Sequence, residues 1–152
     1  MESIAEYLHK SLNYKIGIIT SVPINHATPA SFYGHEPTRR NYDNLTNDLI
    51  ESGFDFFAAG GVLVGNADTS KKIYKNHADV IRKLGENKFQ IISNQKDLNS
   101  LTKATKFPVI VIDTAIWNAQ LKTKNTYTDE KNSLPFALDF PQYKLQLAKY
   151  TE

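Results

Sequence analysis

The sequence contains no cysteine among its 152 residues. Disulfide bonds, thiolate nucleophiles and cysteine-ligated zinc sites are therefore excluded. No apolar run approaches the roughly 18 residues that a membrane-spanning helix needs, so we expect no membrane span. Residues 1–6 lack the cationic and apolar segments of a secretory signal peptide, and none is expected in this chain.

The sequence also lacks an excess of charge of one sign. It has 18 Lys and Arg against 16 Asp and Glu, a formal net charge of +2. Nucleic-acid-binding domains usually carry a basic stripe, so we expect no nucleic-acid partner. The length suits one domain, 1–152, and a chain of this size buries roughly 70% of its unfolded surface, enough for a real core.

Short apolar runs alternate with amphipathic stretches along most of the chain. This alternation predicts an α/β domain with a mostly parallel sheet of about four strands and flanking helices. The expected strands are 15–22, 54–59, 89–92 and 107–112, and the expected helices are 2–13, 41–52 followed by Gly53, 68–84 stopped by Gly85, 97–101 and 142–152. Residues 118–133 are polar and predict an exposed loop.

Two of these elements make detailed predictions. In the first helix, Ser3 and Glu6 form a capping box, and Ile4, Leu8 and Leu12 form one apolar stripe. The run at 15–22 is β-branched and apolar on both faces, which is typical of a strand buried on both sides.

Polar residues suited to chemistry gather in 24–40, just past the end of the first predicted strand. In open α/β sheets, ligands bind at that edge. His26 and Thr28 lie two apart, so an extended backbone would point both to one side. A Thr hydroxyl is a hard oxygen ligand suited to Mg²⁺, and a neutral His binds metal or orients a water. Arg39 or Arg40 could grip two phosphate oxygens at once.

A purely structural interpretation of the same residues stands beside this one. Residues 27–30 could form a simple turn, with Thr28 held extended by the proline that follows it. His35 could be a loop histidine with a satisfied hydrogen bond, and the paired arginines could be solvated surface.

The sequence His26-Ala27-Thr28-Pro29-Ala30, followed by Phe32-Tyr33, His35 and Arg39, resembles the alkaline phosphatase family. The resemblance spans nearly the whole chain and is strongest over 15–61. Weaker matches are Thr20-Ser21-Val22, Asn41-Tyr42, Asp55-Phe56-Phe57, Gly60-Gly61 and residues 134–139. The fold is then expected to be part of an alkaline-phosphatase-like fold.

The resemblance assigns roles to individual positions. Thr28 matches the hydroxyl ligand of the magnesium ion, and His26 lies where members carry Asp or His beside that magnesium. Arg39 matches the catalytic arginine that binds the substrate phosphate. His35 matches a histidine of supporting character, whereas Arg40 has no matched role and is expected at the surface.

Other parts of the family's machinery have no counterpart here. The family uses a serine nucleophile in an Asp-Ser context and two zinc ions about 4 Å apart. The chain contains no Asp-Ser dipeptide, and none of its nine Asp has a His at the next position or four later. The resemblance therefore implies an internal segment, after the nucleophile and before the main zinc ligands, that is inactive in isolation.

The parent protein would hydrolyse phosphate monoesters through a phosphoserine, and by family likeness would be periplasmic or extracellular. Exposed strand edges or apolar faces of such a segment favour a homodimer. Two alternatives stay open: a related phosphodiesterase or sulfatase of the same superfamily, and a non-catalytic flavodoxin-like binding or regulatory domain.

Overall fold

A computed structural model describes residues 1–100 and 108–112 of the chain. The elements, in chain order, are α1 (Ile4–Leu12), β1 (Gly17–Ile19), α2 (Ala27–Ala30), α3 (Tyr42–Glu51), β2 (Phe56–Ala59), the 3₁₀ helix η1 (Thr69–Lys71), α4 (His77–Glu86), β3 (Gln90–Ile92), α5 (Gln95–Ser100) and β4 (Val109–Ile112). The expected loop at 118–133, the family match at 134–139 and the expected helix at 142–152 lie outside the described residues.

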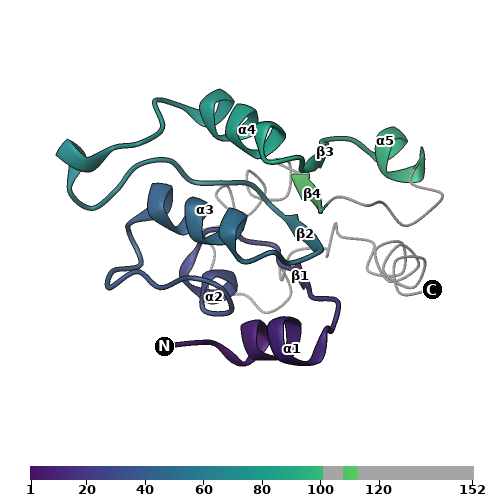
Figure 1. Ribbon diagram of the computed structural model, residues 1–152. Helices are drawn as coiled ribbons and strands as arrows, with labels where there is room; N and C mark the ends of the chain where they lie inside the picture. The colour runs from purple at the N-terminus through teal and green to yellow at the C-terminus, as the bar shows by residue number, and fades with distance from the viewer. Residues whose placement is uncertain (101–107, 113–152) are drawn as a thin grey trace, which may run out of the picture.

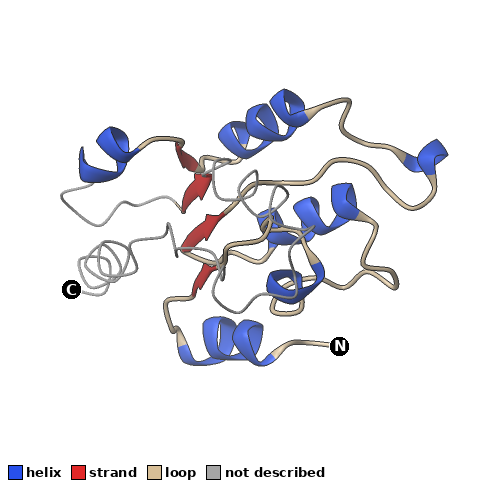
Figure 2. Ribbon diagram, turned by 180° about the vertical axis from the view of Figure 1, so that it is seen from behind, coloured by secondary structure: helices blue, strands red, loops and turns tan. Residues whose placement is uncertain are grey.

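The four strands form one parallel sheet in the order β1-β2-β4-β3. Phe57 of β2 pairs with Ile18 on one side and with Ile110 of β4 on the other. The predicted α/β class with a parallel sheet of about four strands is confirmed. Figure 1 shows α3 and α4 on one side of this sheet and α5 on the other, and Figure 2 gives the same arrangement from behind.

Each face of the sheet has its own apolar cluster. Phe57 and Ile110 pack with Leu49 of α3 and Leu84 of α4 in the larger one. The smaller cluster, on the opposite face, contains Phe56, Ala58, Ile92, Leu98, Val109 and Val111. All residues of β2 and β4 are buried, as expected for central strands of a parallel sheet covered on both faces.

The helix expected at 2–13 is confirmed as α1, and so is its capping box, but its apolar stripe is largely exposed. The Ser3 hydroxyl accepts from the Glu6 N–H, and the Ser3 N–H donates to the Glu6 carboxylate. Ile4 and Leu12 are 66% and 52% exposed, while Ala5 and Glu6 are buried. Glu6 is held by polar contacts with the body of the protein, which turns the apolar stripe outward.

The strand predicted over 15–22 is confirmed as β1, but its predicted burial on both sides is wrong. The strand is limited to Gly17–Ile19, and only Ile18 within it is buried. β1 is an edge strand of the described sheet and pairs with β2 alone. The apolar residues of 15–22 therefore predicted more burial than the strand has.

The predicted helix over 68–84 is two separate elements. Asp68 caps only η1, and α4 begins later, after the N-cap Asn76. Between them the backbone N–H groups of Ile73 and Tyr74 donate to the buried carboxylate of Asp43, which keeps them out of a helical ladder. Gly85 does not stop α4, which runs to Glu86.

The helix expected at 41–52 is confirmed as α3, and Gly53 follows it with φ +72°, a conformation that favours glycine. The short helical stretch expected at 97–101 is α5, which begins earlier, at Gln95. Among the residues described, no helix is long and apolar enough to cross a membrane.

Candidate functional site

The candidate site is built on the chain that leaves β1, and Asn25 fixes it. Asn25 is fully buried. Its amide nitrogen donates to Thr46 Oγ1 and to the carbonyls of Tyr42 and Leu63, and its side-chain oxygen accepts from the Leu63 N–H. These four bonds tie the start of α2 to α3 and to the chain after β2. The backbone at His26, the next residue, is therefore held in a fixed position.

His26 is the N-cap of α2 and has an extended backbone, with φ −72° and ψ 158°. Nη2 of Arg39, thirteen residues later in the chain, lies 3.5 Å from Nε2 of His26. Thr28 lies within the single turn of α2 and is exposed. The extended backbone assumed for Thr28 is therefore wrong, because the chain becomes helical at Ala27, directly after His26.

The far end of α2 is anchored as firmly as its start. The Tyr33 hydroxyl donates to the Ile24 carbonyl over 2.6 Å, and burial, with Asp48 nearby, raises the pKa of that hydroxyl. Gly34 follows, where a Cβ would lie 2.6 Å from Leu45 Cδ2 and 2.8 Å from the Ala30 carbonyl oxygen. Only glycine fits this close approach without displacing α2 or α3.

His35 links this loop to two helices. Its Nε2 lies 3.0 Å from Glu6 Oε1 of α1, and its N–H donates to Asp48 Oδ2 of α3 over 2.8 Å. Burial, with the neighbouring carboxylates Glu36 and Glu51, raises the pKa of Asp48 against the effect of the His35 N–H. These contacts give His35 a bracing position, and its supporting role in the site stays a prediction.

Glu6 is the most strongly perturbed carboxylate of this brace. Burial acts to raise its pKa, but the Ser3 N–H at 2.8 Å and the contacts with His35 outweigh it, and the pKa falls to about 2. The Lys10 amine also lies 3.5 Å from the carboxylate. The folded protein therefore stabilises the ionised form of Glu6.

This shift predicts an acid-sensitive stability. An unfolded Glu titrates near 4.3, so the stabilisation from Glu6 is fully present above about pH 4.5 and is lost as the pH falls toward 2. As the pH falls across this range, the free energy of unfolding measured in urea should decrease in both proteins. The decrease should be smaller in Glu6→Gln than in the unsubstituted chain, by on the order of 2–3 kcal/mol. Glu2→Gln, at an exposed carboxylate of the same segment, is the control. Equal losses in the unsubstituted chain and in Glu6→Gln would contradict the role given to Glu6.

Sequence reasoning missed Asp43, which shapes the chain beside the site. Its carboxylate is fully buried in the first turn of α3. It accepts from the N–H groups of Gly65 at 2.6 Å, Ile73 at 2.7 Å and Tyr74 at 3.2 Å. The only signal in the sequence is an acidic residue early in a predicted helix, which is too common to mark a loop anchor.

The donor set for a metal is partial. Thr28 offers an exposed hydroxyl and His26 an imidazole at the start of the same helical turn. A hard oxygen and a neighbouring group that orients water suit Mg²⁺, which keeps several waters. Within residues 1–100 and 108–112, no three His, Asp or Glu side chains gather closely enough to hold a metal ion. Arg40 is exposed, as expected, and is one of the residues that line a pocket beside α3.

Taken together, the described residues define a parallel α/β protein with a cationic and hydroxyl-bearing turn just past the first strand. No protein-family model matches the chain, and no curated protein sequence matches it.

Solved structures do match. The cold-active alkaline phosphatase of the psychrophile Shewanella sp. superposes with a TM-score of 0.50 at 23% identity, over 71% of this chain and 24% of that one. The alkaline phosphatase of the Antarctic bacterium TAB5 gives 0.50 at 30% identity, over 70% and 29%. A TAB5 variant with a histidine replaced by aspartate and Mg bound in its M3 site gives 0.51 at 30% identity.

The chain is similar to alkaline phosphatases in its fold, and the resemblance stated from its sequence is confirmed. It spans between 24% and 29% of the length of the first two of these enzymes.

Proposed function

We propose that this segment supplies the phosphate-binding arginine and the magnesium-site hydroxyl of an enzyme that hydrolyses phosphate monoesters through a phosphoserine. The observation that carries the proposal is Arg39 beside His26, at the turn that also presents Thr28. The likeness to alkaline phosphatases at 30% identity supports it over the flavodoxin-like alternative.

In this proposal Arg39 binds the transferring phosphoryl group. Its planar guanidinium matches two phosphate oxygens, and its positive charge offsets the charge of the transition state. The contact of Nη2 with His26 Nε2 orients the guanidinium from a rigid base, because Asn25 fixes the residue before His26. Arg39 is exposed, so substrate can reach it.

Thr28, with His26, forms one side of the magnesium site. Mg²⁺ held there would supply fixed positive charge and ordered waters, and zinc bound by residues not matched in this chain would supply the activation of the serine and of the leaving oxygen. The role of this chain in the magnesium site is to hold the Thr28 hydroxyl in a fixed position. The parent protein is proposed to work in the periplasm or outside the cell.

The test compares the isolated chain with the protein that contains it. With zinc and magnesium present, the containing protein should release p-nitrophenol from p-nitrophenyl phosphate and the isolated chain should not. The reason is that positioning a phosphate without nucleophile or zinc leaves the reaction without its attacking group. The proposal fails if the containing protein has no such activity. Turnover by the isolated chain that Arg39→Ala abolishes would overturn the claim that this segment is inactive alone.

A further inference from the structure

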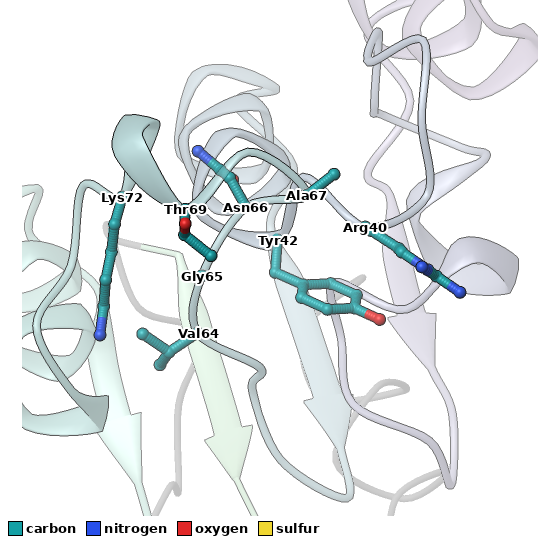
Figure 3. A pocket seen from close by; sticks show the side chains of 8 residues that line it. All are labelled: Arg40, Tyr42, Val64, Gly65, Asn66, Ala67, Thr69 and Lys72. Atoms are coloured by element: carbon teal, nitrogen blue, oxygen red, sulfur yellow. The ribbon is translucent and has the colours of Figure 1, made fainter.

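A cavity of about 410 Å³ lies between the start of α3 and the chain that follows β2. Figure 3 shows Arg40 and Lys72 on opposite sides of the cavity, with the ring of Tyr42 between them. Val64, Gly65 and Thr69 are also among its lining residues. The cavity thus has an apolar and aromatic surface between two cations.

The charge of this cavity is positive. None of its lining residues is acidic. Neither Arg40 nor Lys72 makes an ion pair with any residue that the structure describes, and both are exposed, whereas Lys71 lies 3.6 Å from Asp68. The buried Asp43 carboxylate nearby accepts from three backbone N–H groups. A negative group in the cavity would therefore meet cations and no competing carboxylate.

The cavity is pre-formed because the chain around it is pinned. Asp43 holds Gly65 on one side and the backbone after Lys72 on the other. The Asn66 amide adds a bond to the Lys71 carbonyl over 2.7 Å. Binding a ligand here would order few additional groups, which favours affinity.

The chain that lines the cavity is joined to the chain that carries the proposed phosphate site. Arg40 directly follows Arg39. The Asn25 side chain, next to His26, is hydrogen-bonded to the Tyr42 carbonyl and to Leu63, beside the lining residue Val64. One rigid unit therefore carries both the phosphate-binding arginine and the walls of the cavity.

From this geometry we propose that the cavity receives the leaving group of the phosphate ester and selects leaving groups that carry a second negative charge, a carboxylate or a second phosphate. The inference rests on the proposed function for the position of the ester itself. The cation pair supplies the selectivity, and the Tyr42 ring packs on the apolar body of the leaving group.

Two esters that differ by one carboxylate provide the test. Phenyl phosphate and 4-carboxyphenyl phosphate are titrated into the full 152-residue chain, with backbone amide shifts recorded at Arg39 and at Gly65. We expect the carboxylated ester to bind about fivefold more tightly at low ionic strength, the scale of an exposed ion pair, with the difference shrinking as salt is added. Arg40→Gln and Lys72→Gln should each reduce this preference. Lys71→Gln, the same charge change outside the cavity, should keep it.

Benzoate, which has no phosphate, separates the two proposals. It should shift the Gly65 amide and leave that of Arg39 unmoved. If both esters shift Arg39 with equal affinity and benzoate shifts nothing at Gly65, the cavity inference is overturned and the proposed function stands. If benzoate shifts Gly65 while no ester shifts Arg39, the cavity is an anion site and the proposed function fails. A preference that survives in both Arg40→Gln and Lys72→Gln also overturns the inference.

Discussion

Replacing Arg39 with alanine in the protein that contains this segment is expected to lower kcat/KM for phosphate monoesters by about 10²–10³-fold, the loss seen for one pre-organised donor to a developing charge. Arg39 is the cation held beside His26, and its guanidinium serves the transition state more than the ground state because negative charge accumulates during transfer. Steady-state kinetics with p-nitrophenyl phosphate measures this. The loss should fall on kcat as well as on KM.

Two further variants sharpen the result. Arg39→Lys keeps the charge but loses the paired N–H groups, so its kcat/KM should lie between those of the unsubstituted enzyme and Arg39→Ala. Arg82→Ala removes an exposed arginine of α4 that is paired with Asp79 and Glu86 instead, and should leave the kinetics unchanged. Unchanged kinetics in Arg39→Ala would remove Arg39 from the site.

Replacing Asp43 with alanine is expected to cost about 3–4 kcal/mol of the free energy of unfolding, the largest effect on stability that we predict. The substitution leaves the N–H groups of Gly65, Ile73 and Tyr74 without their acceptor, and Tyr74 is itself buried. Each unmet buried donor costs roughly 1–3 kcal/mol, reduced where water can enter. Urea unfolding followed by circular dichroism gives the value.

The matched control for Asp43 is Glu51→Ala, a carboxylate that is exposed on the same helix. It should change the free energy of unfolding by no more than about 0.5 kcal/mol. Asp43→Asn keeps one acceptor oxygen and should lie between the two. A cost below about 1 kcal/mol for Asp43→Ala would show that the three N–H groups find other partners and that Asp43 does not anchor the loop.

The class of fold was predictable from local patterns. The capping box of Ser3 and Glu6 depends on spacing alone, and Gly53 marked the end of α3 through its backbone freedom. The four strands were visible as short apolar runs. Each of these signals is local, so no knowledge of distant contacts was required.

The errors in the fold came from long-range contacts. Glu6 is buried because His35, 29 residues away, contacts it, and this turns Ile4 to the surface. The predicted helix is interrupted at Ile73 and Tyr74 because Asp43, 30 residues before Ile73, accepts hydrogen bonds from their backbone N–H groups. The edge position of β1 depends on the order of all four strands of the described sheet.

The candidate site was also predictable only in part, through its local signals and not its long-range contacts. Residue types and the family resemblance singled out His26, Thr28 and Arg39 from one short segment. The approach of Arg39 to His26 could not be predicted, because it requires the loop to fold back after Gly34. The structural roles of Asn25 and Asp43 could not be predicted from the sequence, because their hydrogen-bond partners lie 17 to 38 residues away.

The most direct measurement of the central claim is where phosphate and magnesium bind on the full 152-residue chain. Orthophosphate at millimolar concentration, added with and without Mg²⁺, is titrated while backbone amide shifts are recorded. The account predicts that phosphate shifts the amide of Arg39, that Mg²⁺ shifts those of His26 and Thr28, and that Arg39→Ala abolishes the phosphate response alone. Phosphate and Mg²⁺ that leave all three amides unmoved, or phosphate shifts that persist in Arg39→Ala, would contradict it.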